Sequence, residues 1–317
     1  MESRQRLVTI AEAMIARGSK SFAAASRLFD RTTRERVWLL YAWCRRCDDL
    51  IDGQDHGGTL GDQRHVTERL AEVRAMTAAA LAGQPVDDPA FACLGMVAAE
   101  TGLTAAMAEA VIAGFALDAQ GWQPDNEADL MQYCWHVAGA VGVMMAVVMG
   151  VDPADEATLD HACDLGLAFQ LANIVRDIAE DYAAGRRYVP ADWLIEAGVP
   201  EGAELDPRYR DALARIARRM CDQAAAHEAS ARIGARKLAW RQRWAILAAA
   251  GIYGDIARDV AKAGPHAWDQ RVVIGPIRKL GRIARALGEV FRPVTARDRQ
   301  RATARKFTRN ELVARLV

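Results

Sequence analysis

Residues 165–190 read LGLAFQLANIVRDIAEDYAAGRRYVP. Apolar residues recur here at the 3.6-residue spacing of an α-helix, and the pattern predicts a helix over residues 155–182. One face of this helix becomes polar toward its C-terminal end, in the order Cys163, Gly166, Gln170, Asn173, Asp177, Asp181. The rest of the helix is apolar, so exposure to solvent is a poor explanation for the row. Polar side chains in a buried helix need partners, which makes this row a candidate functional site.

The same periodicity predicts helices over residues 32–51, 65–82, 89–101, 104–118, 127–149, 207–231 and 236–261. No strand-like alternation bounded by hairpin turns occurs, so the sequence predicts an all-α fold. The breaks between the helices are too short to be interdomain linkers. We therefore predict a single helical domain over residues 1–290, followed by a basic C-terminal tail over residues 291–317.

Composition and charge exclude several classes of protein. The chain has 317 residues, 51% of them hydrophobic, which is ample material for a core. Its 41 basic and 41 acidic residues balance, which argues against a nucleic-acid-binding domain. Residues 265–317 carry 13 Lys/Arg and four Asp/Glu, so this end could contact an anionic membrane or form a solvated tail. Pro276 could begin a helix suited to a membrane surface or to packing on the bundle, with an apolar face formed by Ile277, Leu280, Ile283, Leu287 and Val290.

The cysteines and the N-terminus indicate a cytoplasmic protein. The six cysteines lie mostly in apolar stretches without a second CxxC, which favours buried free thiols over a zinc site. The N-terminal residues lack the apolar core of a signal peptide. The longest apolar run, over residues 137–151, is shorter than the roughly 20 residues that span a bilayer.

A second acidic pair lies in the predicted helix over residues 32–51. Thr32 and Glu35 fit a capping box at its start. The inward face then runs through Val37, Tyr41 and Cys44, and its next positions are Asp48 and Asp52. Carboxylates where apolar residues are expected are typical of functional sites.

Both acidic pairs, Asp48/Asp52 and Asp177/Asp181, have the i, i+4 spacing that places two carboxylates on one helical face. Arginines accompany each pair, notably Arg45 and Arg176. These charges could form simple ion-pair networks. Alternatively, they could bind Mg²⁺ and phosphate together, because Mg²⁺ prefers one or two carboxylates plus phosphate oxygens and guanidinium groups bind the remaining oxygens.

An apolar helix over residues 127–149 carries small residues at four-residue steps, which suits close helix packing or the approach of a slender apolar ligand. Two acidic faces in an apolar helical bundle suggest a lipidic diphosphate as substrate. Aromatic side chains could pack in the core or stabilise a carbocation by cation–π attraction; the candidates are Tyr41, Tyr133, Tyr253, Phe22 and Trp43. The sequence has no P-loop, GxGxxG, GxSxG or HExxH motif.

Four segments resemble the squalene/phytoene synthase family. They are SKSF (19–22), YAWCRRCDDLID (41–52), YCWHVAGAVGVMM (133–145) and the stretch over residues 165–190 quoted above. The resemblance extends from Ser19 to about Arg271. It implies an α-helical isoprenoid synthase fold with two aspartate-rich motifs that face each other across a central cavity.

The resemblance also implies roles for individual residues. Asp48, Asp52, Asp177, Asp181 and Asn173 would bind metal, and Tyr41 and Arg45 would take part in catalysis. The substrate would contact Ser21, Phe22, Tyr41, Arg45, Tyr133, Gln170, Asn173, Arg176, Tyr253 and Arg271. Some relatives have a histidine before the S-x-S-F segment, where this chain has Gly18, so a phosphate contact from that position is not expected.

The activity that the resemblance implies is head-to-head condensation of two geranylgeranyl diphosphates, through prephytoene diphosphate, to phytoene. It would need Mg²⁺ or Mn²⁺ and no NADPH, and the C-terminal region could add a peripheral membrane contact. A dehydrosqualene or squalene synthase acting on two farnesyl diphosphates is the alternative within the family. A helical interaction or membrane-surface protein is the alternative outside it.

Overall fold

The structure, a computed structural model, describes residues 3–53 and 65–315. Within them it gives the backbone but not the side chains of Lys20, Ser21 and Ala24. All regular elements of this described part are helical, which confirms the predicted all-α class. The chain divides into two compact units, residues 1–120 with 143–159 and residues 121–142 with 160–317. The prediction of one synthase domain over residues 1–290 with a tail after it stays a prediction.

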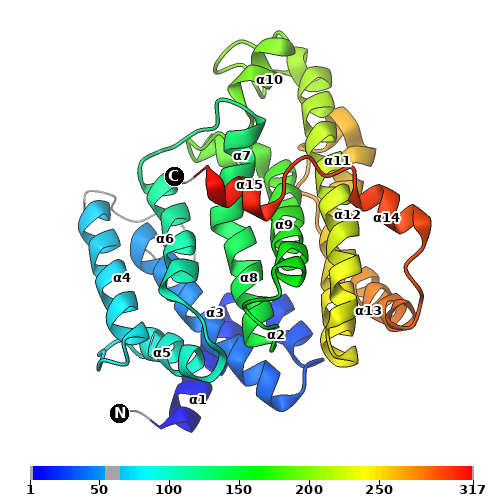
Figure 1. Cartoon of the computed structure of the whole chain (residues 1–317). Helices are drawn as coiled ribbons and strands as arrows, with labels where there is room; N and C mark the ends of the chain where they lie inside the picture. The colour runs from blue at the N-terminus through cyan, green and yellow to red at the C-terminus, as the bar shows by residue number, and fades with distance from the viewer. Residues whose placement is uncertain (1–2, 54–64, 316–317) are drawn as a thin grey trace. The chain divides into compact units, whose positions relative to one another are not determined.

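The first unit is built from the N-terminal helices (Figure 1). In chain order these are α1 (Arg4–Gly18), α2 (Lys20–Ser26), α3 (Arg31–Asp52), α4 (Val66–Leu81), α5 (Pro89–Thr101) and α6 (Ala105–Ala119). α3 is their centre, because it packs against α1, α4, α5 and α6. Its fully buried Trp43 donates to the Thr77 hydroxyl of α4 over 3.2 Å. The core of this unit therefore fixes the helix that carries Asp48 and Asp52.

The start of α3 differs from the predicted capping box. Asp30 is the N-cap, and its carboxylate accepts from the Thr33 backbone N–H over 3.0 Å. Glu35 instead accepts from Arg31 of the same helix and from Arg4 of α1. The Thr32/Glu35 box was therefore wrong, because a better capping residue lies two positions upstream and tertiary ion pairs engage Glu35.

The second unit contains the C-terminal helices. Its elements are α7 (Glu127–Cys134), the π-helical segment η1 (Trp135–Gly139), α10 (Ala191–Glu196), α11 (Arg210–Gly234), α12 (Trp240–Ala263), α13 (Pro276–Val290), α14 (Ala296–Ala302) and α15 (Arg309–Ala314). The unit boundary falls within α8 (Ala140–Val148) and within α9 (Glu156–Ala183). α12 packs against both α11 and α13, as the yellow and orange ribbons of Figure 1 show.

The segment formed by η1 and the start of α8 approaches α9 closely in this second unit. A Cβ added at Gly142 would lie 2.4 Å from the carbonyl oxygen of Ala162, and one at Gly166 would lie 2.2 Å from that of Ala138. Glycine is needed at both positions, because no side chain fits between the two backbones. Gly142 belongs to the row of small residues that the sequence assigned either to close helix packing or to the approach of an apolar ligand. In the structure it serves close helix packing.

The continuous helix Glu127–Val148 corrects one expectation from sequence. Among the described residues it is the one helix long and apolar enough to cross a membrane by length and composition. The sequence estimate was wrong because it counted only an uninterrupted apolar run. Of its most apolar window, 67% is buried in the structure, which is typical of a core helix.

Candidate functional site

The first acidic motif lies on the second half of α3, in the first unit. Arg45 is its central cation: its Nη1 lies 3.0 Å from the Asp48 carboxylate, and its Nη2 donates to Asp49. Asp49 is buried at 2% exposure, whereas Asp48 and Asp52 are half-buried. Sequence reasoning missed Asp49, although its i, i+4 spacing from Arg45 was a usable signal.

Asp48 lies in an environment that opposes its negative charge. Its pKa is raised to about 6, because burial and the charges of Asp52 and Asp49 together outweigh the opposing effect of Arg45. The charged form of Asp48 is therefore less favourable than that of an exposed aspartate, and a nearby cation would stabilise it. A divalent cation would supply that charge, so the electrostatics of this pair fit a metal ligand.

Tyr41 and Phe22 lie beside this motif in the same unit. Their rings meet edge to face with centroids 5.7 Å apart, and burial raises the pKa of the Tyr41 hydroxyl. A Cβ at Gly18 would lie 2.3 Å from that hydroxyl oxygen. A histidine at position 18 would therefore clash with Tyr41 as it is placed here. The side chain of Ser21, predicted to contact substrate, lies outside the described residues.

The second acidic motif lies on α9, in the second unit, and its first carboxylate is already paired. Arg176 Nε donates to Asp177 over 2.7 Å, and Arg271 donates to both carboxylate oxygens over 2.8 and 3.0 Å. Burial alone would raise the pKa of Asp177, but the hydrogen bonds and charges of these two guanidinium groups hold it below its usual value. Arg271 comes from the segment before α13, and its side chain is 49% exposed.

The rest of the polar row on α9 is accessible. Gln170, Asn173 and Asp181 are half-buried, while the residues between them, such as Ile174 and Ile178, are buried. The sequence excluded solvent as the explanation for this row; in the structure its polar side chains are partly exposed, on one face of a helix whose other faces form the core. This exposure leaves them available to a ligand.

The two predicted tyrosines of the second unit lie in aromatic stacks. Tyr133 stacks between Trp122 and Tyr188, with centroid distances of 5.5 and 4.8 Å. Tyr253 of α12 stacks on Phe169 of α9 at 4.0 Å, and burial raises its pKa. Sequence reasoning missed these stacking partners, because pairs so distant along the chain leave no local pattern.

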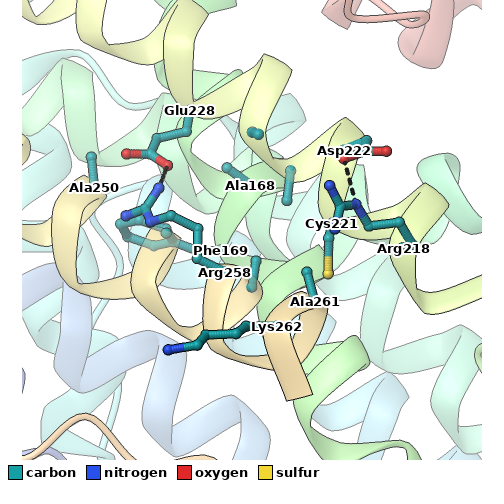
Figure 2. A pocket seen from close by; sticks show the side chains of 14 residues that line it. Ala168, Phe169, Arg218, Cys221, Asp222, Glu228, Ala250, Arg258, Ala261 and Lys262 are labelled. Atoms are coloured by element: carbon teal, nitrogen blue, oxygen red, sulfur yellow. Dashed lines mark hydrogen bonds and ion pairs between the residues drawn. The ribbon is translucent and has the colours of Figure 1, made fainter. Parts of the chain in front are cut away.

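A pocket of about 410 Å³ lies between α9, α11 and α12 in the second unit. Figure 2 shows its wall of small side chains, with the ion pairs Glu228–Arg258 and Asp222–Arg218 at its sides. Phe169 lines it and connects it to Tyr253 through their stack. None of the predicted catalytic or metal-binding residues lines this pocket.

The described residues contain no group of three or more His, Cys, Asp or Glu side chains placed to hold a metal ion by themselves. Paired carboxylates are nonetheless what Mg²⁺ uses when substrate phosphate and water complete its coordination. Asp48/Asp52 and Asp177/Asp181 thus fit a metal that binds together with a phosphate substrate.

Comparisons with known proteins agree with this chemistry. The squalene/phytoene synthase family profile matches residues 15–278. A phytoene synthase of Pseudescherichia vulneris is 44% identical over 297 residues, covering 93% of this chain and 96% of the relative. A 15-cis-phytoene synthase of Enterobacter agglomerans is 44% identical over 287 residues, covering 90% and 96%.

Among solved structures, a dehydrosqualene synthase in complex with ligand aligns with a TM-score of 0.79 and 27% identity, covering 90% of this chain and 96% of that one. It has the all-α isoprenoid synthase fold that the sequence predicted. Because the family profile matches most of the chain and the relatives match along nearly their whole length, the chain belongs to the squalene/phytoene synthase family.

Proposed function

We propose that the chain is a prenyltransferase that condenses two geranylgeranyl diphosphates to phytoene. The observation that carries this proposal is the 44% identity to phytoene synthases over nearly the full length of both chains. The two carboxylate pairs with their guanidinium partners support it, because they provide the charges that diphosphate release requires. A dehydrosqualene synthase aligns well in fold but at lower identity, which favours the C40 product over the C30 alternative.

The reaction proceeds in two ionisation steps. Loss of diphosphate from the first substrate gives an allylic cation, and the double bond of the second substrate attacks it. Loss of a proton then gives the cyclopropyl intermediate, prephytoene diphosphate. Loss of the second diphosphate, rearrangement and loss of a second proton yield phytoene. Two diphosphates and two protons thus leave for each phytoene formed, and no reductant is consumed.

The carboxylates of Asp48, Asp52, Asp177 and Asp181, with the amide of Asn173, would hold Mg²⁺ or Mn²⁺, which supplies electrophilic assistance to the departing diphosphate. The arginines have a second role. With Asp177 bound to a metal, the guanidinium of Arg271 would be free to donate two N–H groups to phosphate oxygens. Its exposed position and bidentate geometry support this exchange. Arg176 and Arg45 bind diphosphate in the same way.

The remaining predicted residues position the hydrocarbon and protect the cation. Tyr41 and Phe22 present aromatic groups that stabilise positive charge, whereas Tyr133 and Tyr253, whose rings are stacked on other aromatic residues, line the substrate. Gln170 lies on the same face of α9 as the metal-binding residues and contacts substrate. Ser21 contacts the diphosphate. Exclusion of water by this apolar lining prevents capture of the cation as an alcohol.

The test is an assay of the purified chain with labelled geranylgeranyl diphosphate or farnesyl diphosphate, with Mg²⁺ and without NADPH. We expect a C40 product from the C20 substrate. A C30 product alone would assign the chain to the dehydrosqualene synthases. Asp177→Asn should abolish turnover while helicity by circular dichroism is kept, whereas Asp211→Asn, an exposed aspartate of α11, should leave turnover unchanged. An active Asp177→Asn enzyme would refute the metal-ligand role.

We also propose that this enzyme is cytoplasmic and contacts an anionic membrane surface through α13. Ile277, Leu280 and Phe291 are 84%, 66% and 76% exposed, while Ile283 packs on the core cluster of α12. The flanking basic residues complement anionic lipid. Replacing Ile277 and Leu280 by serine should weaken co-sedimentation with phosphatidylglycerol vesicles. Ile195→Ser, which removes an equally exposed apolar side chain of α10, is the control, and an equal loss in both would exclude α13 as the contact.

A further inference from the structure

An arginine-lined pocket in the second unit lies apart from every residue assigned above. It has a volume of about 370 Å³ and lies where α11, α12 and α13 meet the segment leading into α14. Its charged lining comprises seven arginines and two carboxylates: Arg232, Arg236, Arg258, Arg282, Arg285, Arg292, Arg301, Glu289 and Asp298. The pocket therefore concentrates positive charge.

Carboxylates around the pocket are shared among several arginines rather than paired one to one. Buried Glu228 accepts from Arg232 over 2.7 Å and from Arg258 over 2.9 Å. Buried Asp255 accepts from Arg282 over 2.7 Å and also from Arg258 over 3.1 Å. Glu228 and Asp255 thus hold the guanidinium groups in place, but their two negative charges do not balance the positive charge of the arginines.

Two arginines of the lining have no carboxylate within ion-pair distance among the described residues. They are Arg236, which follows α11, and Arg301 in α14. Burial lowers the pKa of Arg236, the neighbouring charges of Arg243 and Arg292 lower it further, and Asp298 opposes them without forming an ion pair. Like charges held together in this way raise the free energy of the empty pocket, and an anion would relieve the repulsion.

α12 is shaped to admit this cluster. A Cβ at Gly251 would lie 3.2 Å from Cδ of Arg282 and 3.6 Å from Nη2 of Arg232. A Cβ at Gly254 would lie 2.2 Å from the carboxylate of Glu228 and 2.7 Å from Nη2 of Arg258. Gly251 therefore leaves room for Arg282 and Arg232 of the pocket lining, and Gly254 leaves room for the ion pair of Glu228 and Arg258.

We propose that this pocket binds a phosphate group carrying at least two negative charges, with Arg236 and Arg301 as its principal donors. Planar guanidinium forks match the oxygens of a phosphate, and several of them converge here. The phosphate belongs to a soluble diphosphate or to the headgroup of an anionic lipid. On α13, Leu280 and Arg282 are about 160° apart around the helix axis, so the pocket and the exposed apolar stripe lie on different faces.

The experiment titrates inorganic diphosphate into the full chain in EDTA by calorimetry. Under the proposed function Arg45, Arg176 and Arg271 also bind diphosphate, so the wild-type titration alone does not identify the pocket. Variants of the pocket arginines distinguish the two sites. Arg236→Gln and Arg301→Gln should each weaken one bound diphosphate at least about tenfold, since a charged hydrogen bond is lost. Lys237→Gln and Arg299→Gln remove the same charge from neighbouring residues outside the pocket and should change affinity less than about twofold.

Sedimentation with phosphatidylglycerol or phosphatidylcholine vesicles distinguishes the two sources of phosphate. Weakened binding of Arg301→Gln to the anionic vesicles, without a change for free diphosphate, assigns the site to a lipid headgroup. Weakened binding of free diphosphate, without a change for the anionic vesicles, assigns the site to a soluble anion. Equal effects of Arg301→Gln and Arg299→Gln in both experiments would overturn the proposal. These readouts measure binding, so they hold whether or not the chain forms phytoene.

Discussion

Gly166→Ala tests how tightly the fold holds the helix that carries the second acidic motif. The added Cβ would lie 2.2 Å from the carbonyl oxygen of Ala138, 2.5 Å from its carbonyl carbon and 2.8 Å from Cα of Gly139. Ordinary contacts of a Cβ begin at 3.4 Å, so the two helices must separate by about 1 Å. All three obstructing atoms belong to the backbone, and no side chain can rotate away to make room.

Overpacking a core usually costs about 1–3 kcal/mol when side chains adjust, so a backbone displacement should cost about 3 kcal/mol or more. The better helix propensity of alanine returns about 1 kcal/mol. We therefore expect a net loss of about 2 kcal/mol in the free energy of unfolding. Gln170 and Asn173 follow Gly166 on the same face of α9, so they move with the helix. A displacement of about 1 Å in positioned groups can lower turnover about 100-fold.

The measurement is urea unfolding by circular dichroism, together with the phytoene assay. Gly288→Ala is the matched control, because a Cβ at Gly288 in α13 meets no atom within 4 Å. It should stabilise the protein by about 0.5–1 kcal/mol through helix propensity alone. If Gly166→Ala proves as stable and active as Gly288→Ala, the close approach of η1 to α9 is not as described here.

Three further predictions concern charge. Burial would raise the pKa of Glu35, but hydrogen bonds from Arg31 and Arg4 lower it below its usual value in the folded state. The ionised carboxylate therefore stabilises the fold above about pH 4.5, and this contribution is lost as the pH falls through the folded pKa. Glu35→Gln should lower Tm at pH 7 and much less at pH 3. Arg305→Met removes the guanidinium from the buried carboxylate of Asp164, which keeps His227 and the Ser230 hydroxyl as partners, and should cost about 2 kcal/mol in urea unfolding, whereas Lys306→Met, which breaks an exposed pair, should cost less than about 1 kcal/mol. EDTA should stop phytoene synthesis and added Mg²⁺ restore it, and turnover that persists in EDTA would contradict the metal role of the aspartates.

Helices with strong periodicity and clear end signals could be predicted from the sequence. The predicted helix over 89–101 matches α5 (Pro89–Thr101), where Asp88 caps the start and Gly102 ends the helix in the left-handed conformation. α1 was not predicted, although Leu7, Ala11 and Ile15 place a buried row on one face. Short elements such as α10, α14 and α15 were also missed, because their stability depends on tertiary contacts rather than on an apolar period.

The candidate site, like the fold, could be predicted from the sequence only in part. The i, i+4 spacing of each aspartate pair and the arginine beside it were visible in the sequence, because they lie within one or two helical turns. The contact of Arg271 with Asp177 spans 94 positions, and the stacking of Phe169 on Tyr253 joins two helices. The identities of Tyr253 and Arg271 came from the family resemblance, and only the fold supplies their partners.

The two acidic motifs share their spacing but not their electrostatics. On α3, burial and neighbouring carboxylates outweigh Arg45, and Asp48 has a raised pKa. On α9, Arg176 and Arg271 outweigh burial, and Asp177 has a lowered pKa. Asp48 therefore lies in a site that favours an added positive charge, whereas Asp177 already has two guanidinium partners within the protein. Under the proposed function, a metal at Asp177 would have to compete with these arginines, which would then be available to phosphate oxygens. Two motifs of the same spacing thus differ in their electrostatics, because Arg271 reaches the second motif from a distant part of the chain.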